Sequence, residues 1–194
     1  MAEGTTGPQR AYRAPCPGCG APVEFRSAQS THAVCPYFQS TVVRQGDTLA
    51  RIGKMAELFE DFSPLQLFAS GRVEGQGFTL IGRLTYRYEG GQWTEWIAAL
   101  DDGRSGTLSE DNGAFVFSLP FELTRDVPPA AALRLGMTTA FEGRGFVVTS
   151  VHEVSLVSAQ GELPRLPAPG DPLTVVELRG DGRDVGLSLE YDTQ

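Results

Sequence analysis

Three cysteines in this chain have the spacing of metal ligands. CPGCG at 16–20 contains a CxxC pair, and CPYFQ at 35–39 repeats its frame with Phe38 where the second cysteine is expected. Zinc in structural sites binds four thiolate or imidazole ligands in a tetrahedron, and a CxxC turn presents two sulfur atoms to one ion. Cys16, Cys19 and Cys35 would supply three of the four ligands. The pattern predicts a zinc-ribbon-like module with a degenerate second turn.

The fourth ligand has several candidates. His32 lies three residues before Cys35, which is a reasonable spacing for two ligands of one ion, so we expect it to complete the site. The alternatives are water, a carboxylate such as Glu24, or a module that no longer binds metal. A redox role for the CPGC pair is less favoured, because the motif precedes a strand pattern and lacks the helix that lowers a thiol pKa.

Other chemistry has little support in the sequence. Trp93 and Trp96, with Glu95 between them, form an aromatic cluster that is a speculative ligand-binding site, although core packing is the more common role of such residues. His152 lies in an alternating run and is interpreted as a strand surface residue. No GxSxG, HExxH or phosphate-binding loop is present, so we expect no enzymatic activity.

Composition and charge narrow the class of protein. The chain has 194 residues, a net charge of −8 and a pI near 4.8, which argues against general nucleic-acid binding. No apolar run is long enough to span a membrane, and the first residues lack a secretory signal. Cysteine usage points to a reducing compartment, so we expect a cytoplasmic protein.

The elements that would position these residues are mostly strands. Short β-branched and aromatic runs from residue 64 onward alternate with turn signals at GG 90–91, DDG 101–103, DNG 111–113 and DG 181–182. EGQGFTLIGRL (74–84) resembles EGRGFVVTSVH (142–152), which indicates an internal repeat. One helix is predicted, because Ile52, Met55, Phe59 and Phe62 recur on one helical face.

The predicted fold is mainly β, with a small ribbon, one connecting helix, and two related antiparallel β-units forming a barrel-like or sandwich-like body. The predicted boundaries are a flexible leader at 1–14, the ribbon at 15–46, the helix at 47–63, and the β-domain at 64–194 with halves at about 64–125 and 132–194.

These motifs together resemble a bacterial family of uncharacterised proteins, a "domain of unknown function" family. Its members open with a CPxCG…CPYC ribbon, continue with an IGKMA-like segment and an SPLQ turn, and carry a GxGF…WxEW…DG β-domain. The corresponding segments here are CPGCG (16–20), CPYF (35–38), IGKMAEL (52–58), SPLQ (63–66), GFTLIGR (77–83), WTEW (93–96) and GELP (161–164). Phe38 departs from the family's fourth cysteine.

The resemblance implies a role but no reaction. Family members occur beside genes for membrane-stress proteins of the phage-shock type and for polyamine-synthesis-like enzymes. We therefore expect a non-enzymatic adaptor or scaffold that contacts protein partners in an envelope-stress system. It would associate with membranes only through those partners and would bind no nucleic acid. The alternative is a β-barrel that binds a small ligand, such as a polycation.

Overall fold

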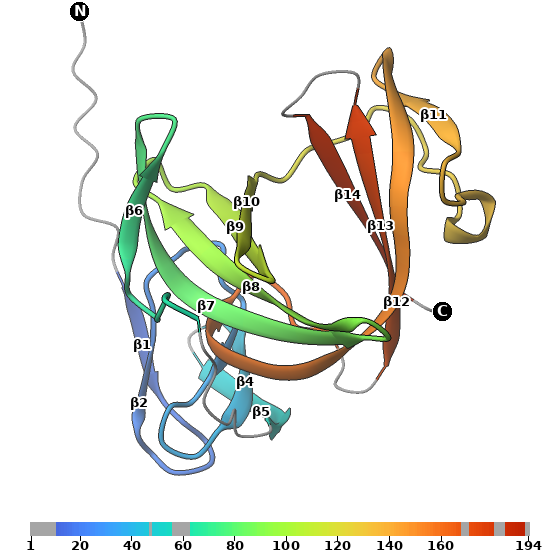
Figure 1. The fold of residues 1–194 in the computed structure, drawn as a ribbon. Helices are drawn as coiled ribbons and strands as arrows, with labels where there is room; N and C mark the ends of the chain where they lie inside the picture. Colours follow the sequence, from blue (N-terminus) through green and yellow to red (C-terminus); the bar gives the residue numbers. More distant parts are fainter. Residues whose placement is uncertain (1–10, 47, 56–62, 168–170, 181–184, 193–194) are drawn as a thin grey trace, which may run out of the picture. The chain divides into compact units, whose positions relative to one another are not determined.

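Strands make up most of the described chain in the computed structural model, which describes residues 11–46, 48–55, 63–167, 171–180 and 185–192. One 3-10 turn, η1 (Ala130–Ala132), is its only regular helical segment within those ranges. The strands (Figure 1) are β1 (Tyr12–Pro15), β2 (Pro22–Phe25), β3 (His32–Val34), β4 (Ser40–Gln45), β5 (Thr48–Lys54), β6 (Ser70–Val73), β7 (Gln76–Tyr88), β8 (Gly91–Leu100), β9 (Ser105–Asp111), β10 (Ala114–Ser118), β11 (Thr138–Phe141), β12 (Arg144–Leu163), β13 (Pro172–Gly180) and β14 (Gly186–Asp192). The prediction of a mainly β protein is confirmed.

The chain forms two compact units, each described by itself below. Unit 1 comprises residues 1–85, 93–119 and 157–167, and unit 2 comprises residues 86–92, 120–156 and 168–194. The long strands β7 and β12 contribute residues to both units. The ribbon and the first part of the predicted β-domain therefore belong to one compact unit.

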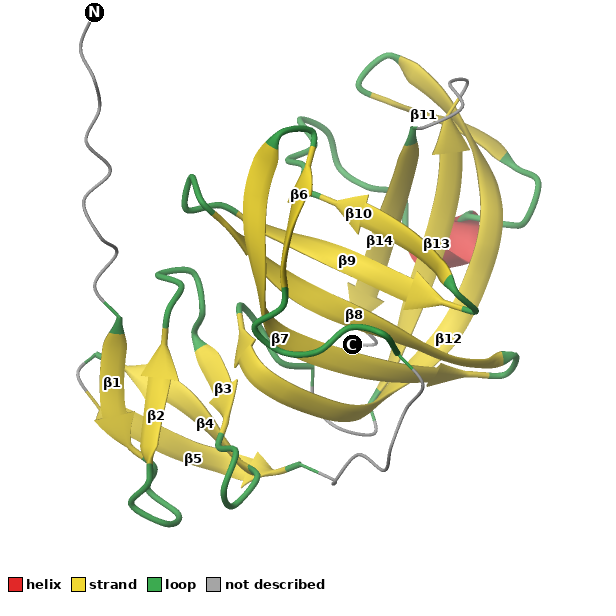
Figure 2. Ribbon diagram, turned by 60° about the vertical axis from the view of Figure 1, so that its left-hand side comes forward, coloured by secondary structure: helices red, strands yellow, loops and turns green. Residues whose placement is uncertain are grey.

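Unit 1 is built on an antiparallel meander. Its strands follow the order β10-β9-β8-β7, continue through the C-terminal part of β12, and end with β3-β4-β5 (Figure 2). Strand β6 pairs with β7, and β1 pairs with β2 as a separate hairpin. The antiparallel sheet is not closed into a barrel, because β10 and β5 lie at the two ends of this order.

Two glycines allow β7 and β12 to approach each other closely. A Cβ atom on Gly82 would collide with the carbonyl oxygen of Glu162, and one on Gly161 would collide with that of Ile81. Gly161 also has φ +69°, which residues with a side chain rarely adopt. Beyond this point β12 pairs with β3, from Gly161 opposite Val34 to Leu163 opposite His32. The end of β12 thus anchors the ribbon strands to the sheet.

Three hairpins share one type of tight turn. Glu74–Gly75 joins β6 to β7, Asn112–Gly113 joins β9 to β10, and Glu142–Gly143 joins β11 to β12, all with positive φ at both residues. This conformation is the type I′ turn that matches the twist of antiparallel strands. The predicted DNG turn is confirmed. Both EGxGF segments adopt the same hairpin turn, whereas the DG at 181–182 lies outside the described residues.

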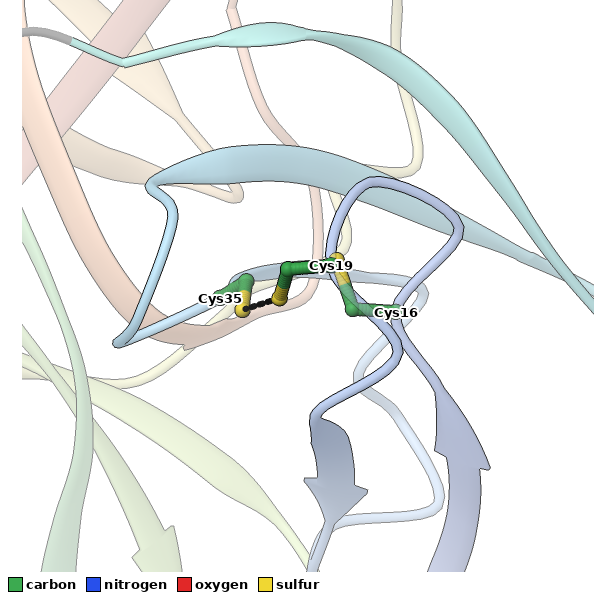
Figure 3. Close-up of side chains that lie close together, drawn as sticks. All are labelled: Cys16, Cys19 and Cys35. Atoms are coloured by element: carbon green, nitrogen blue, oxygen red, sulfur yellow. Dashed lines mark hydrogen bonds between the residues drawn. The ribbon is translucent and has the colours of Figure 1, made fainter.

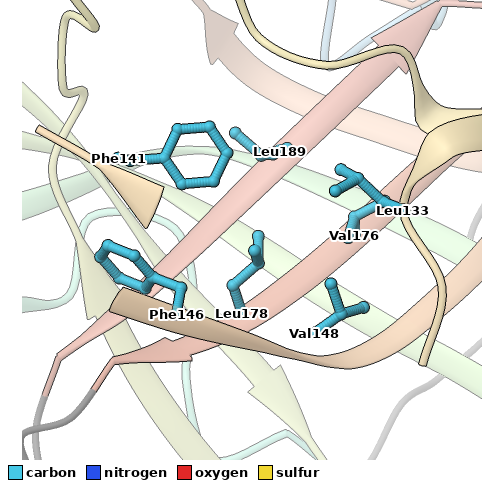
Figure 4. Packing of buried hydrophobic residues seen from close by; sticks show 7 residues of the cluster. All are labelled: Leu133, Phe141, Phe146, Val148, Val176, Leu178 and Leu189. Carbon is cyan, nitrogen blue, oxygen red and sulfur yellow. The ribbon is translucent and has the colours of Figure 1, made fainter. Parts of the chain in front are cut away.

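Unit 2 contains the four-stranded antiparallel order β11-β12-β13-β14. Its buried side chains come from all four of these strands and from the segment after η1 (Figure 4). The cluster is Leu133, Phe141, Phe146, Val148, Val176, Leu178 and Leu189. The rings of Phe141 and Phe146 meet edge to face at 5.9 Å.

The prediction of a helix over 47–63 is wrong for residues 48–54, which form strand β5. This strand pairs with β4 from Thr48 opposite Gln45 to Lys54 opposite Ser40. The pairing overrides the helical spacing of the apolar residues, and Ile52 is exposed whereas Met55 is buried. The rest of the predicted helix, residues 56–62, lies outside the described residues. The predicted leader is also shorter than 1–14, because β1 begins at Tyr12.

Candidate metal centre

The two CP turns have the same backbone geometry. In the first, the Gly20 N–H donates to the Cys16 carbonyl at 2.8 Å, and in the second the Gln39 N–H donates to the Cys35 carbonyl at 2.8 Å. The fifth residue of each turn has positive φ, +75° at Gly20 and +52° at Gln39. Each turn therefore forms a knuckle of the kind that holds a metal through its first and fourth residues.

The structure brings the three cysteines together, as the spacing predicted. Their sulfur atoms all lie within 4.8 Å of one another, and Figure 3 shows the three side chains converging. The Sγ atoms of Cys19 and Cys35 are 3.7 Å apart, close enough for both to bind one ion through metal–sulfur bonds of about 2.3 Å. All three are free thiols, with Cys16 and Cys35 buried and Cys19 exposed. The cluster could hold a metal ion.

The surroundings shift the pKa values of the two buried thiols, Cys16 and Cys35, in opposite directions. Burial raises the pKa of Cys16, but hydrogen bonds from the backbone N–H groups of Gly18 and Cys19 and from the neighbouring thiols outweigh it, and the net pKa is lowered. Burial raises the pKa of Cys35, and the contacts with the Cys19 and Cys16 thiols add to that rise. Cys16 is therefore the sulfur that ionises first of these two.

His32 is not brought to the cluster. Among the described residues, only the three cysteine sulfurs come together as possible metal ligands at the cluster. The His32 ring lies on β3, and its Nδ1 is 2.8 Å from the hydroxyl of Thr31. Burial lowers the pKa of His32. The structure thus gives no support to His32 as the fourth ligand.

Phe38 occupies the backbone position of the fourth ligand. Its ring is partly exposed, and the Lys54 Nζ and the Arg51 guanidinium lie 4.9 and 5.9 Å from the ring centroid. The ring also packs near Gly18, where its Cδ1 atom would be 3.2 Å from an added Cβ. This set of residues lacks the fourth protein ligand of a structural zinc ribbon, because Phe38 offers no ligand atom at that backbone position.

The residues of the predicted aromatic ligand site lie on strand β8, where Trp96 is buried and Trp93 and Glu95 are half-buried. Trp96 is 1% exposed, and its indole N–H donates to Glu110 Oε2 at 3.0 Å. The Trp93 indole N–H donates to Glu95 Oε1 at 3.3 Å. The three residues thus lie together on β8, but Trp96 belongs to the buried cluster with Leu80 and Ala98 rather than to an open pocket.

A cavity of about 570 Å³ lies elsewhere in unit 1, between the ribbon and the sheet. Residues from β2, the second knuckle, the loop before β6 and the end of β12 line it. Tyr37 is 74% exposed there, and the Arg26 guanidinium stacks over the Phe68 ring at 4.2 Å. Glu24 lies 3.5 Å from Arg13 and 3.8 Å from Arg26. Sequence patterns missed this cavity, because its walls come from segments far apart in the chain.

Sequence patterns also missed Glu162. Its buried carboxylate accepts the backbone N–H groups of Arg26 and Ser27 at 2.7 and 3.0 Å. Burial raises the pKa of Glu162, while these bonds, the Ser30 hydroxyl and the Arg26 charge oppose the rise. The only sequence signal was its position in the GELP segment, which says nothing of its partners. Glu162 fixes the loop between β2 and β3 to the end of β12.

Fold and site together define an all-β protein with a three-cysteine knuckle pair on an open antiparallel sheet. Residues 69–194 match the family described as a domain of unknown function, DUF4178, and the chain belongs to that family. No curated protein matches the chain, and no solved structure does. Within the described residues, no helix has the length and apolar character needed to cross a membrane.

Proposed function

We propose that this protein is a non-enzymatic adaptor that binds an extended segment of a protein partner along the edge strand β10. The partner class that the family resemblance implies is a component of an envelope-stress system. The observation that carries the proposal is an apolar strand at the end of the unit 1 sheet order. Strand addition to such an edge is a common mode of peptide recognition.

The side chains of this edge support the proposal. Phe115 and Val116 of β10 are 46% and 63% exposed, and Leu119 just after the strand is 43% exposed. Proteins usually protect an edge strand with charges, proline or a bulge, because an exposed apolar edge pairs with other chains. An exposed apolar edge on a folded protein marks an interaction site, so we expect a partner to cover it.

The backbone of β10 also suits strand addition. Ala114 pairs with Asp111 across the type I′ turn, and Val116 and Ser118 follow in register opposite Ser109 and Thr107. Alternation in an antiparallel ladder then directs the N–H and C=O groups of Phe115 and Phe117 away from β9. An added strand would use these groups for main-chain hydrogen bonds and the exposed side chains for specificity.

The metal would have a structural role in this adaptor. An ion on the three cysteines would join the two knuckles, and through β3 it would stabilise the attachment of the ribbon to β12. Zinc is the ion that a complete four-ligand ribbon holds. The three-thiolate set of this chain lacks the fourth ligand of such a ribbon.

The proposal is tested by crosslinking at the edge in native cells. A photo-crosslinking residue at Val116 is expected to capture one predominant partner, and Phe115→Lys in the same chain is expected to reduce the captured amount at least about tenfold. The matched control is Leu135→Lys, since Leu135 is 73% exposed and lies in unit 2. Equal capture by the Phe115→Lys variant, or loss of capture by Leu135→Lys, contradicts the proposal.

A second candidate function is small-ligand binding in the cavity of about 570 Å³, whose size is typical of ligand sites. Two arginines, Arg13 and Arg26, and two carboxylates, Glu24 and Glu162, line this cavity, and Glu24 pairs with both arginines. Screening anionic and polycationic metabolites by thermal shift, with Arg26→Ala as the comparison, tests this alternative. A ligand of the cavity would stabilise the unaltered protein and lose its effect on the Arg26→Ala variant.

A further inference from the structure

We propose that Cys16, Cys19 and Cys35 form a three-thiolate site for a soft ion of low coordination number, of which monovalent copper is the biological example, rather than a tetrahedral zinc site. The inference concerns the metal of the ribbon and is independent of the role proposed for β10. A zinc ribbon has four ligand positions, and only three of them carry a cysteine in this chain.

The first step is the position of Phe38. Corresponding hydrogen bonds close the two knuckles, from the Cys16 N–H to the Ala21 carbonyl at 2.7 Å and from the Cys35 N–H to the Ser40 carbonyl at 2.9 Å. The backbone of Phe38 therefore corresponds to that of Cys19. A phenyl ring at this position offers no ligand atom, and it leaves three sulfurs on one side of the site.

The second step is that no described side chain replaces the missing thiolate. No imidazole or carboxylate of the described residues joins the sulfur cluster. The Ser40 hydroxyl is buried without a hydrogen-bond partner and packs near Gly18. A neutral hydroxyl is a weak and hard donor compared with a thiolate, so it does not make a good fourth ligand for zinc.

The third step is the match between three sulfurs and a soft ion. Soft thiolate ligands suit monovalent copper as well as zinc and iron–sulfur clusters, and of these, monovalent copper is the ion that three sulfur donors in a plane satisfy. A structural zinc site takes four protein ligands, so zinc would need water as its fourth donor here. The Lys54 ammonium and the Arg51 guanidinium lie 4.9 and 5.9 Å from the Phe38 ring centroid, which places positive charge beside the second knuckle.

The burial of the sulfurs suggests how the ion enters. Cys16 is 2% exposed and Cys35 is fully buried, whereas Cys19 is exposed. An incoming ion would meet the Cys19 sulfur first and then exchange donor ligands for the two buried thiolates. The exposed Cys19 thiolate suits ligand exchange with another thiol-bound source of the ion, and Cys35 also borders the cavity of about 570 Å³.

The test measures the affinities of the full, reduced chain for monovalent copper and for zinc, each in competition with a chromophoric chelator and with ascorbate present for copper. The key variant is Phe38→Cys, which restores four cysteines, and Phe38→Leu is the matched control without a ligand atom. We expect Phe38→Cys to raise the zinc affinity at least about a hundredfold and the copper affinity less than about tenfold. Phe38→Leu should leave both within about threefold.

X-ray absorption of the copper-loaded chain should show three sulfur neighbours, and Cys35→Ser should lower the copper affinity at least about a hundredfold. The proposal is overturned if Phe38→Cys leaves the zinc affinity unchanged, which would mean that the site already holds zinc fully. It is also overturned if Ser40→Ala weakens zinc binding, since Ser40 would then complete a tetrahedron. Copper bound with fewer than three sulfur neighbours overturns it as well.

Discussion

Glu162 connects the loop after β2 to the end of β12 through its carboxylate, and this connection depends on pH. Its folded-state pKa is raised above the ordinary value near 4.5 by burial. A raised folded-state pKa means that the folded chain holds the proton more tightly than the unfolded chain does. The associated stability is present below about pH 4.5 and is lost as the pH rises through the folded-state pKa.

The first prediction concerns Glu162→Gln, which keeps an oxygen acceptor but cannot ionise. Above pH 4.5 the free energy of unfolding of the unaltered chain should fall relative to that of the variant, because only the unaltered chain must bury a charge. Urea unfolding across this pH range measures the difference. Glu153→Gln, at an exposed position of β12, is the control. A difference that is constant with pH contradicts the prediction.

Which residues come together at the metal site was predictable only where local spacing decides it. The convergence of Cys16, Cys19 and Cys35 follows from the two CP turns, whose geometry is local. The position of His32 was not predictable, because the direction of its side chain depends on the register of β3 with β4 and β12. The bond from Arg26 to Glu162 spans 136 residues, and no local pattern contains it.

At the scale of elements, the two EGxGF hairpin turns have the same sequence pattern but differ in the hydrogen bonds of their glutamate side chains. Glu74 and Glu142 both have φ +48° in type I′ turns, a conformation that favours asparagine or glycine over glutamate. The Glu142 carboxylate accepts the N–H and the hydroxyl of Thr124 at 2.8 and 2.7 Å. Within the described residues, the Glu74 side chain makes no such bond.

The second prediction follows from this difference. Glu74→Asn should raise the free energy of unfolding by about 0.5–1 kcal/mol, because it relieves the unfavourable backbone conformation. Glu142→Asn should give no gain, because the shorter side chain loses the bonds to Thr124. Thermal and urea unfolding of the two variants measure the contrast. Equal stabilisation by both substitutions would show that the Thr124 contacts contribute nothing.

Turns and strands were predictable to different degrees. Asn-Gly and Asp-Gly pairs at 111–113 and 101–103 favour turns through local backbone preferences, and both turns formed. The segment 48–54 has helical spacing of apolar residues but folds as a strand, since pairing with β4 and the burial of Met55 outweigh weak local preference. Local rules thus succeed at turns and fail where pairing decides.

At the scale of the whole molecule, the metal site is linked to the sheet through the ribbon strands. Cys35 follows β3 directly, and β3 pairs with the last residues of β12. An ion that binds only the folded chain stabilises it by mass action, by about 2.7 kcal/mol at a free concentration a hundred times the dissociation constant. The effect should extend to every part of unit 1 that unfolds together with the ribbon.

The third prediction is that bound metal slows hydrogen exchange beyond the knuckles. Amides of residues 159–163 in β12 should become more protected when one equivalent of monovalent copper is added, and Cys19→Ser should abolish the change. Hydrogen exchange read by mass spectrometry measures this. Protection confined to residues 16–39 would mean that the ribbon unfolds independently of the sheet.

Pairing of β3 with β12 also has a consequence for synthesis of the chain on the ribosome. The ribbon strands leave the ribosome long before the residues that complete their sheet, since Glu162 follows Arg26 by 136 residues. Closing so long a loop is slow compared with forming the local hairpins. During elongation the nascent ribbon therefore has an exposed strand edge, and the thiols that will hold an ion are already available to bind one.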